Sequence, residues 1–282
     1  MSSGLRVAAG LVLALLAGCD QGTVQLDVGD APVDDADRVV VQFTGVTLER
    51  TDGDDESFTF NPPRPIDLAA QVEGATVALL DGTSVQEGDF EAVRLRVSAD
   101  GSGTDSFVEV GGIARPLLLA EIDRPRLRVA RPFTVVRQEE TQLIVDFDLR
   151  KSVHTPDSGT SPYELRPSLR VVDPEDVGAI AGTVSAALAG ASGCRPAVYV
   201  YTGHSATAND EGSALPPFAS ARVRVAGADF FYRVPFLPAG NYTAAFTCNA
   251  AADDPQLDDT ISFTGAKNVT VDEEATVTAS FP

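Results

Sequence analysis

The chain has 282 residues, of which 44% are hydrophobic, so it is long enough for one large domain or two modest ones with packed cores. It carries 41 acidic and 21 basic residues, and its formal net charge is −20. A field of this sign repels nucleic acid and anionic lipid headgroups, which argues against nucleic-acid binding and against an electrostatic attachment to a membrane.

The first 18 residues have the pattern of a signal peptide. One positive charge, Arg6, precedes an apolar stretch from Val7 to Ala17, and small residues stand directly before Cys19. The apolar stretch is shorter than the roughly 20 residues that a membrane-spanning helix needs. We therefore expect residues 1–18 to be a lipoprotein signal peptide that is removed on export.

The tetrad Leu16-Ala17-Gly18-Cys19 resembles the lipobox of bacterial lipoproteins. The resemblance implies that the Cys19 thiol takes a diacylglyceryl group and that the lipid bilayer is a partner through this anchor. The alternative is an ordinary secretory signal followed by an unrelated cysteine. Asp20 resembles the signal that keeps some Gram-negative lipoproteins in the inner membrane. We expect a lipid-anchored protein on the periplasmic face of the cell envelope, with the inner membrane favoured over the outer.

After residue 19 the chain alternates apolar and polar residues in short runs, a pattern typical of half-buried β-strands. Gly, Pro, Asp and Asn fill the gaps between the runs, as turns require. Short strands at this spacing predict an antiparallel sandwich or barrel. The strands predicted in the first half are 23–28, 38–43, 46–48, 57–60, 76–80, 92–97, 107–110, 114–120, 126–129, 133–136, 142–149 and 163–172.

A polar segment with a proline, residues 173–176, marks a boundary, and a new strand pattern begins after it. Segments 203–217 and 249–259 are rich in small and polar residues and are predicted to be loops. We expect an all-β chain with two antiparallel β-sandwich domains in tandem, at residues 19–177 and 178–282. The strands predicted in the second half are 179–184, 197–201, 221–225, 230–234, 242–248, 260–263, 267–271 and 276–281.

Several short segments of the first half are similar to those of one family of exported bacterial proteins. They are Gly22–Leu26, Asp30–Ala36, Gly88–Leu95, Asp146–Ser152 and Tyr163–Pro167. Over residues of about 22–173 the chain thus resembles the family known as domain of unknown function 4382. The resemblance implies a fold and an exported location, and it carries no activity.

The second half resembles the carboxypeptidase regulatory-like, or transthyretin-like, sandwich. The segments that carry the resemblance are Gly182–Val184, Val234–Thr243, Asn268–Val271 and Thr276–Phe281. Modules of this kind usually accompany another domain and are not themselves catalytic. The resemblance therefore implies a sandwich with a binding or structural role.

Cys194 and Cys248 are the pair that remains when Cys19 is set aside. In an oxidising compartment an even pair predicts one disulfide. The alternative is two free buried thiols. A zinc site is not expected, because two cysteines without nearby histidines do not supply four ligands.

Calcium is the one metal for which the sequence offers a candidate site. Calcium binds several hard oxygen ligands, which carboxylates supply. Neither of two acidic stretches has the twelve-residue EF-hand spacing, and a solvated acidic loop is the alternative for both. Apart from calcium we expect no cofactor. The first stretch offers Asp27, Asp30, Asp34, Asp35 and Asp37, and the second is residues 52–56.

Asp146 and Asp148 are predicted to lie on one face of a strand, because side chains in a strand repeat with a period of two. Two carboxylates on one face can perform acid–base catalysis if their pKa values separate. The alternative, which we favour, is a solvent-facing pair that forms ion pairs with Arg150 and Lys151.

His154 and His204 are the two histidines of the chain, and both are predicted to be surface residues of loops. The chain has no nucleophile elbow, phosphate-binding glycine loop or HExxH motif. We therefore expect no catalytic residues and no enzyme activity. The sequence favours a non-catalytic binding or structural module of the envelope, whose partner is a glycan or an envelope protein. The alternative is a hydrolase that acts on envelope polysaccharide through Asp146 and Asp148.

Overall fold

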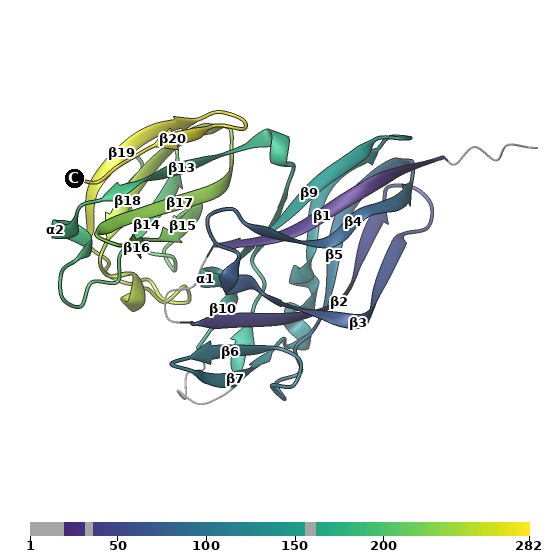
Figure 1. The fold of residues 1–282 in the computed structure, drawn as a ribbon, viewed down its shortest axis with the longest axis horizontal. Coiled ribbons are helices and arrows are strands. Elements are labelled where there is room, and N and C mark those ends of the chain that lie inside the picture. Colours follow the sequence, from purple (N-terminus) through teal and green to yellow (C-terminus); the bar gives the residue numbers. More distant parts are fainter. Residues whose placement is uncertain (1–19, 32–35, 156–161) are drawn as a thin grey trace, which may run out of the picture.

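The computed structural model describes residues 20–31, 36–155 and 162–282 (Figure 1). Strands and loops account for nearly all of these residues, which confirms the expected all-β fold. None of the helices in these ranges is long and apolar enough to cross a membrane. The helices are α1 (Leu149–Ser152), α2 (Ala186–Ala189) and four 3-10 helices at Leu68–Ala70, Glu121–Leu127, Pro174–Asp176 and Ala250–Ala252.

The first twelve strands form two facing sheets, which we call the first sandwich. One sheet has the order β12-β9-β1-β4. The other has the order β10-β11-β7-β6-β2-β5-β8, with β3 beside β2. The pairs β1–β9 and β7–β11 are parallel, and the remaining pairs of these sheets are antiparallel. The strands are β1 (Gln21–Ala31), β2 (Arg38–Arg50), β3 (Glu56–Asp67), β4 (Thr76–Gln86), β5 (Gly88–Ser98), β6 (Phe107–Val110), β7 (Ile113–Leu118), β8 (Arg128–Val135), β9 (Glu140–Asp148), β10 (Val153–His154), β11 (Tyr163–Leu165) and β12 (Leu169–Val172).

The last eight strands form the second sandwich, which lies at the left in Figure 1. Its two sheets have the orders β16-β17-β13-β20 and β15-β14-β18-β19, and β13–β20 is a parallel pair. The rings of Tyr232, Phe246 and Phe281 meet in its core. The strands are β13 (Val177–Val184), β14 (Ala197–Thr202), β15 (Ala219–Arg222), β16 (Arg224–Ala226), β17 (Asp229–Pro238), β18 (Gly240–Thr247), β19 (Phe263–Val271) and β20 (Thr276–Thr278).

Alternation of residue types explains the core of the first sandwich. Val24, Leu26 and Val28 share one face of β1 and are fully buried in the same cluster as Val39 and Val41 of β2. Burying one such side chain stabilises the fold by about 1.5–3 kcal/mol. The alternate apolar side chains that predicted these strands are therefore also the side chains that fill the space between the sheets.

Several predicted strand boundaries are wrong, among them 126–129 and 133–136, which form the single strand β8, and 260–263 and 267–271, which form the single strand β19. Two further errors have identifiable reasons. The runs 38–43 and 46–48 form one strand, β2, whose register shifts between Phe43 and Gly45. A Cβ on Gly45 would lie 2.4 Å from the carbonyl oxygen of Phe58, so only glycine allows the two strands to approach there. Conversely, the run 163–172 divides into β11 and β12, which belong to different sheets, with Pro167 between them.

The division between the sheets falls at residues 173–176, since β12 ends at Val172 and β13 begins at Val177. Val172 and Val177 form a small apolar cluster with Phe236 of β17. The ring of Phe236 lies against the first sandwich, because a Cβ on Gly29 of β1 would be only 3.1 Å from it. Phe236 has a φ of 58°, a left-handed conformation that is unusual for a large side chain and costs free energy.

Candidate binding site between the two sandwiches

The end of β9 directs two basic side chains toward the second sandwich. The Asp148 carboxylate accepts a hydrogen bond of 3.2 Å from the Lys151 backbone N–H and so caps the single turn of α1. Arg150 and Lys151 lie on this turn. The turn α1 lies at the junction of the two sandwiches (Figure 1), and both cations form hydrogen bonds with residues of the second sandwich.

Arg150 forms the central contact of the junction. Its side chain is only 4% exposed, and Nη1 donates a hydrogen bond of 2.6 Å to the phenol oxygen of Tyr199 in β14. The Tyr199 hydroxyl in turn donates to the Asp253 carboxylate. Burial raises the pKa of Tyr199 far above its usual value, so the phenol stays protonated and can act as acceptor and donor at once.

Lys151 neutralises a buried carboxylate of the second sandwich. Its Nζ lies 3.3 Å from Glu211 Oε2 and 3.4 Å from Asp148 Oδ2, and it donates a bond of 2.7 Å to the Pro217 carbonyl oxygen. Burial alone would lower the pKa of Lys151, but the carboxylates of Asp148 and Glu211 outweigh it and raise the pKa. We call Asp148, Arg150, Lys151, Tyr199, Glu211 and Asp253 the interdomain cluster.

Glu211 has no exposed side-chain surface. Burial raises its pKa to about 7, although the positive charges of Lys151 and Arg150 act in the opposite direction. Removing one partner of such a buried pair leaves an uncompensated charge, which is strongly destabilising. The cluster therefore fixes the two sandwiches in one relative position.

A cavity of about 250 Å³ lies beside the interdomain cluster and is lined by both sandwiches. Val108, His154 and Tyr163 contribute from the first, and residues 250–255 contribute from the second. This volume lies just below the usual range for small-molecule sites, and polar and apolar groups both line it. The arrangement can hold a small polar ligand, and it contains no activated nucleophile among its described residues.

Asp146 and Asp148 do not form a solvent-facing pair as predicted. Asp146 is 4% exposed and forms an ion pair with Arg170 of β12, whose guanidinium lies 4.4 Å from the ring centre of Phe218 in the second sandwich. The expectation of an exposed face is therefore wrong for Asp146, which is buried beside an arginine that itself packs against the second sandwich. Burial raises the pKa of Asp146 in spite of Arg170. The predicted pairing of Asp148 with Lys151 is confirmed.

The two histidines differ in environment. His204 is exposed, as predicted. His154 is 7% exposed, which corrects the prediction of a surface residue. Its Nε2 lies 3.0 Å from the Lys151 carbonyl oxygen, at the junction that the second sandwich covers. Burial lowers the pKa of His154, and the nearby charge of Arg166 lowers it further.

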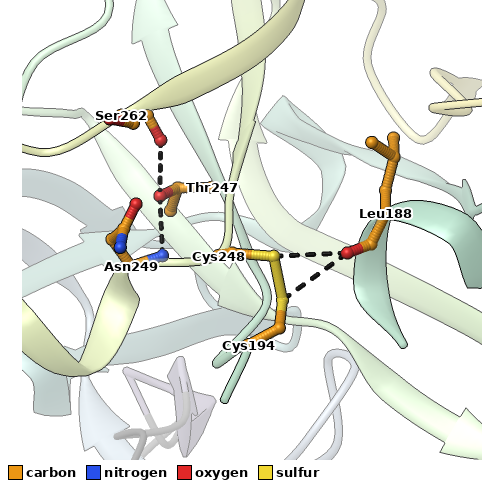
Figure 2. Close-up of a disulfide and its surroundings, with 6 residues drawn as sticks. All are labelled: Leu188, Cys194, Thr247, Cys248, Asn249 and Ser262. Atoms are coloured by element: carbon orange, nitrogen blue, oxygen red, sulfur yellow. Dashed lines mark hydrogen bonds between the residues drawn. A yellow bond between two sulfur atoms is a disulfide. The ribbon is translucent and has the colours of Figure 1, made fainter. Parts of the chain in front are cut away.

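The predicted disulfide between Cys194 and Cys248 is confirmed. It joins the segment before β14 to the segment after β18, and the Leu188 carbonyl oxygen lies beside both sulfurs (Figure 2). The bond closes a loop of 54 residues, over which a cross-link stabilises by about 4 kcal/mol in the chain-entropy model.

The calcium prediction for the first acidic stretch stays a prediction. Asp34 and Asp35 lie outside the described residues, as does the lipidation site Cys19, and the side chain of Asp30 is not described either. The Asp27 carboxylate accepts hydrogen bonds from Gln25 and from Thr76, the latter at 2.7 Å. Asp37 accepts a bond of 3.2 Å from the Gly112 N–H.

Tyr199, Glu211 and Asp253 were missed by sequence reasoning. Tyr199 lies in a run of apolar residues, and its pattern is that of a core side chain. Glu211 and Asp253 lie in segments whose composition correctly predicts loops but gives no sign of burial. Only the packing of one sandwich against the other distinguishes them from solvated acids.

Residues 21–167, more than half of the chain, match the model of the family described as "Domain of unknown function (DUF4382)". No curated protein matches the chain.

Among solved structures, the chain is similar to the Bacillus anthracis TIE protein, with 11% identity and a TM-score of 0.22 over 92% of this chain and 33% of the other. It thus spans about a third of that chain. It is also similar to a minor pilin of Streptococcus agalactiae, with 10% identity and a TM-score of 0.21 over 92% and 94% of the two chains. A third is a putative cell adhesion protein from Bacteroides eggerthii, with 13% identity and a TM-score of 0.22 over 92% and 86%. These likenesses concern the fold alone.

Proposed function

The chain belongs to the DUF4382 family, and we propose that it is a lipid-anchored, non-catalytic module of the cell envelope that holds its second sandwich away from a membrane. In this proposal Cys19 carries the lipid, residues 19–177 form the domain next to the membrane, and residues 178–282 form the distal domain. The distal domain is a carboxypeptidase regulatory-like sandwich. The protein binds a glycan or an envelope protein, or serves as a scaffold for one.

One structural observation carries the proposal, namely the direction of β1. This strand begins at Gln21, two residues after Cys19, at the end of the first sandwich that is opposite to the second sandwich (Figure 1). Eight residues further along, Gly29 contacts Phe236 of the second sandwich. At about 3.3 Å per residue, β1 separates these two points by about 26 Å.

The short connection to Cys19 has a mechanical consequence. Asp20 is tied into the first sandwich, because its carbonyl oxygen accepts a bond of 2.9 Å from the Glu87 N–H and its carboxylate lies 3.3 Å from Arg137 Nη1. An acyl anchor on the preceding residue therefore has almost no linker. Two or more acyl chains would hold the first sandwich firmly at the bilayer surface.

The interdomain cluster makes the distal position of the second sandwich permanent. A flexible junction would let the second sandwich fold back toward the membrane. The buried pairs Arg150–Tyr199 and Lys151–Glu211 oppose this movement. Separating the sandwiches would leave each of these polar or charged groups without its partner, which costs free energy.

Metabolic labelling with radioactive palmitate tests the anchor. We expect the wild-type chain to incorporate label and to fractionate with membranes, and we expect Cys19→Ser to lose both properties. The matched control is the double variant Cys194→Ala/Cys248→Ala, which also removes thiols and should keep its label on a denaturing gel. A labelled Cys19→Ser chain, or an unlabelled wild-type chain, contradicts the proposal. Separation of the two membranes on a density gradient then tests the proposed inner-membrane location.

A glycan array and a hydrolysis assay on envelope polysaccharide test the absence of catalysis. We expect binding without turnover, or no binding in the case of a scaffold. Turnover that is lost in Asp148→Asn would instead establish the hydrolase.

A further inference from the structure

Two loops of the second sandwich pack closely against each other beside the interdomain cluster. One loop joins β14 to β15 and the other joins β18 to β19. The Glu211 N–H donates a bond of 3.0 Å to Asp253 Oδ1, and the Asp259 N–H donates a bond of 2.8 Å to Asp210 Oδ2. A Cβ on Gly212 would lie 1.8 Å from the Leu257 carbonyl oxygen, so the loops meet backbone to backbone at this glycine.

The base of the second loop is held rigidly. The Thr247 hydroxyl donates a bond of 2.9 Å to the Ser262 carbonyl oxygen and accepts one of 3.0 Å from the Asn249 N–H, next to the disulfide (Figure 2). These bonds connect the two ends of the loop. The loop therefore presents its acidic side chains in a defined arrangement.

Three carboxylates converge where the loops meet. Asp210, Asp253 and Asp259 each offer one oxygen, and these three oxygens lie within 4.8 Å of one another. Asp210 is fully buried and Asp253 is 9% exposed. The positive charge of Arg150 acts on Asp253 across the Tyr199 hydroxyl. Like charges at such a separation, removed from water, repel one another strongly.

One oxygen of this group is separate evidence for a bound ligand. Asp210 Oδ1 is buried and accepts no hydrogen bond from any described residue, whereas Oδ2 accepts the Asp259 N–H. A buried carboxylate oxygen without a donor costs several kcal/mol unless something positive replaces the lost water. A cation coordinated by Oδ1 supplies that compensation.

We propose that Asp210, Asp253 and Asp259 bind one calcium ion and that this ion joins the two loops. Calcium lies about 2.3–2.6 Å from each ligand oxygen, so two of its ligands are at most about 5 Å apart, which the observed group satisfies. The three donors are hard carboxylate oxygens, a set that selects calcium, magnesium or manganese rather than zinc. Two irregular loops suit the flexible coordination of calcium better than the strict octahedron of magnesium.

The ion would also act on the junction of the sandwiches. Asp253 accepts the Tyr199 hydroxyl, which bridges to Arg150, and Glu211 follows Asp210 directly in the chain. Fixing the two loops thus fixes the groups that the first sandwich contacts. The inference does not depend on the lipid anchor of the proposed function.

Terbium luminescence of the full chain in detergent tests the site. The chain contains no tryptophan, so sensitised emission must come from tyrosine, and Tyr199 is hydrogen bonded to a proposed ligand. We expect terbium emission on tyrosine excitation, its displacement by calcium, and a calcium-dependent rise in Tm. We expect Asp210→Asn and Asp259→Asn each to weaken calcium binding at least tenfold. The matched control is Asp258→Asn, an exposed carboxylate of the same loop, which should change the affinity less than twofold.

Three results would overturn the proposal. The first is no calcium effect on Tm or on terbium emission at about 10 mM, well above the range of weak extracellular calcium sites. The second is binding that persists in both Asp210→Asn and Asp259→Asn, which would locate the ion elsewhere, for example in the acidic stretch that contains Asp27. The third is an equal loss in Asp258→Asn, which would show a diffuse charge effect. If Asp210→Asn does not fold, the wild-type titration and Asp259→Asn still decide the matter.

Discussion

The guanidinium of Arg150 donates a hydrogen bond of 2.6 Å to the phenol oxygen of Tyr199, and this bond crosses from the first sandwich to the second. The Tyr199 hydroxyl in turn donates a hydrogen bond to the Asp253 carboxylate. A buried cation and a buried anion are thereby matched through a neutral phenol. This chain of hydrogen bonds stabilises the junction between the two sandwiches.

Tyr199→Phe removes the hydroxyl and leaves both charged partners buried without it. We expect the free energy of unfolding to fall by about 1–3 kcal/mol. A double-mutant cycle with Arg150→Met should give a coupling energy of about 0.5–3 kcal/mol in chemical denaturation. The control is Tyr232→Phe, whose hydroxyl bonds only to Ala279 within the second sandwich and should not couple to Arg150. Strict additivity of Tyr199→Phe and Arg150→Met would show that the bond does not connect the sandwiches.

The left-handed backbone of Phe236 leads to an unusual order of stabilities. Phe236→Ala removes the apolar contact with Val172 and Val177 and should cost about 3–5 kcal/mol. Phe236→Gly removes the same contact but relieves the strained φ of 58°, so it should be more stable than the alanine variant by about 1 kcal/mol. In an ordinary strand position glycine is the less stable of the two. Thermal unfolding of both variants checks the order, and an alanine variant more stable than the glycine variant would contradict the account.

The disulfide should contribute substantially to the stability of the second sandwich. Cys194→Ala/Cys248→Ala opens a loop of 54 residues and should lower the free energy of unfolding by about 4 kcal/mol. Denaturation of the oxidised chain with and without a reductant gives the same comparison without a mutation. Two thiols that react with a labelling reagent in the unreduced, denatured chain would show that the bond is not formed.

His154 makes the stability of the fold depend on pH. Burial lowers its folded pKa below the ordinary value of 6.5, so between these two values the unfolded chain binds more protons than the folded chain. Stability from this residue is therefore present above pH 6.5 and is lost as the pH falls toward the folded pKa. The variant His154→Gln keeps a donor for the Lys151 carbonyl oxygen but does not titrate. We expect the wild type to lose stability relative to this variant between pH 7.5 and pH 5. A constant difference across that range would mean that His154 is not held neutral by the fold.

The strands of this chain can be predicted from its sequence because they follow from the alternation of neighbouring residues. Val24, Leu26 and Val28 alternate with polar residues, and the alternation alone predicts which face is buried. The same reasoning fails for Asp146, which is buried beside Arg170, and Arg170 in turn lies over the ring of Phe218 in the other sandwich. A local pattern cannot report a neighbour that is more than 70 residues away.

The candidate site was predictable only in part for the same reason. The ion pair of Asp148 and Lys151 is a contact between residues three apart, and the sequence predicts it. The convergence of Asp210, Asp253 and Asp259 depends instead on two loops that the order of strands brings together. The acidic composition of the two loops is visible in the sequence. The short distances between their carboxylates follow from the order of strands in the sheet, which the sequence does not show directly.

The central claim, that a lipid on Cys19 holds the second sandwich away from a bilayer, can be measured directly. A fluorescent donor is attached to a cysteine introduced at exposed Glu87, which hydrogen bonds to Asp20, or at exposed Ala266 of β19. Acylated Cys19 and the disulfide leave the new cysteine as the one reactive thiol. The chain is then placed on vesicles with acceptors on the lipid headgroups. We predict efficient energy transfer from position 87, much less from position 266, and none from either in Cys19→Ser. Equal transfer from the two positions, or transfer that survives Cys19→Ser, would contradict the account.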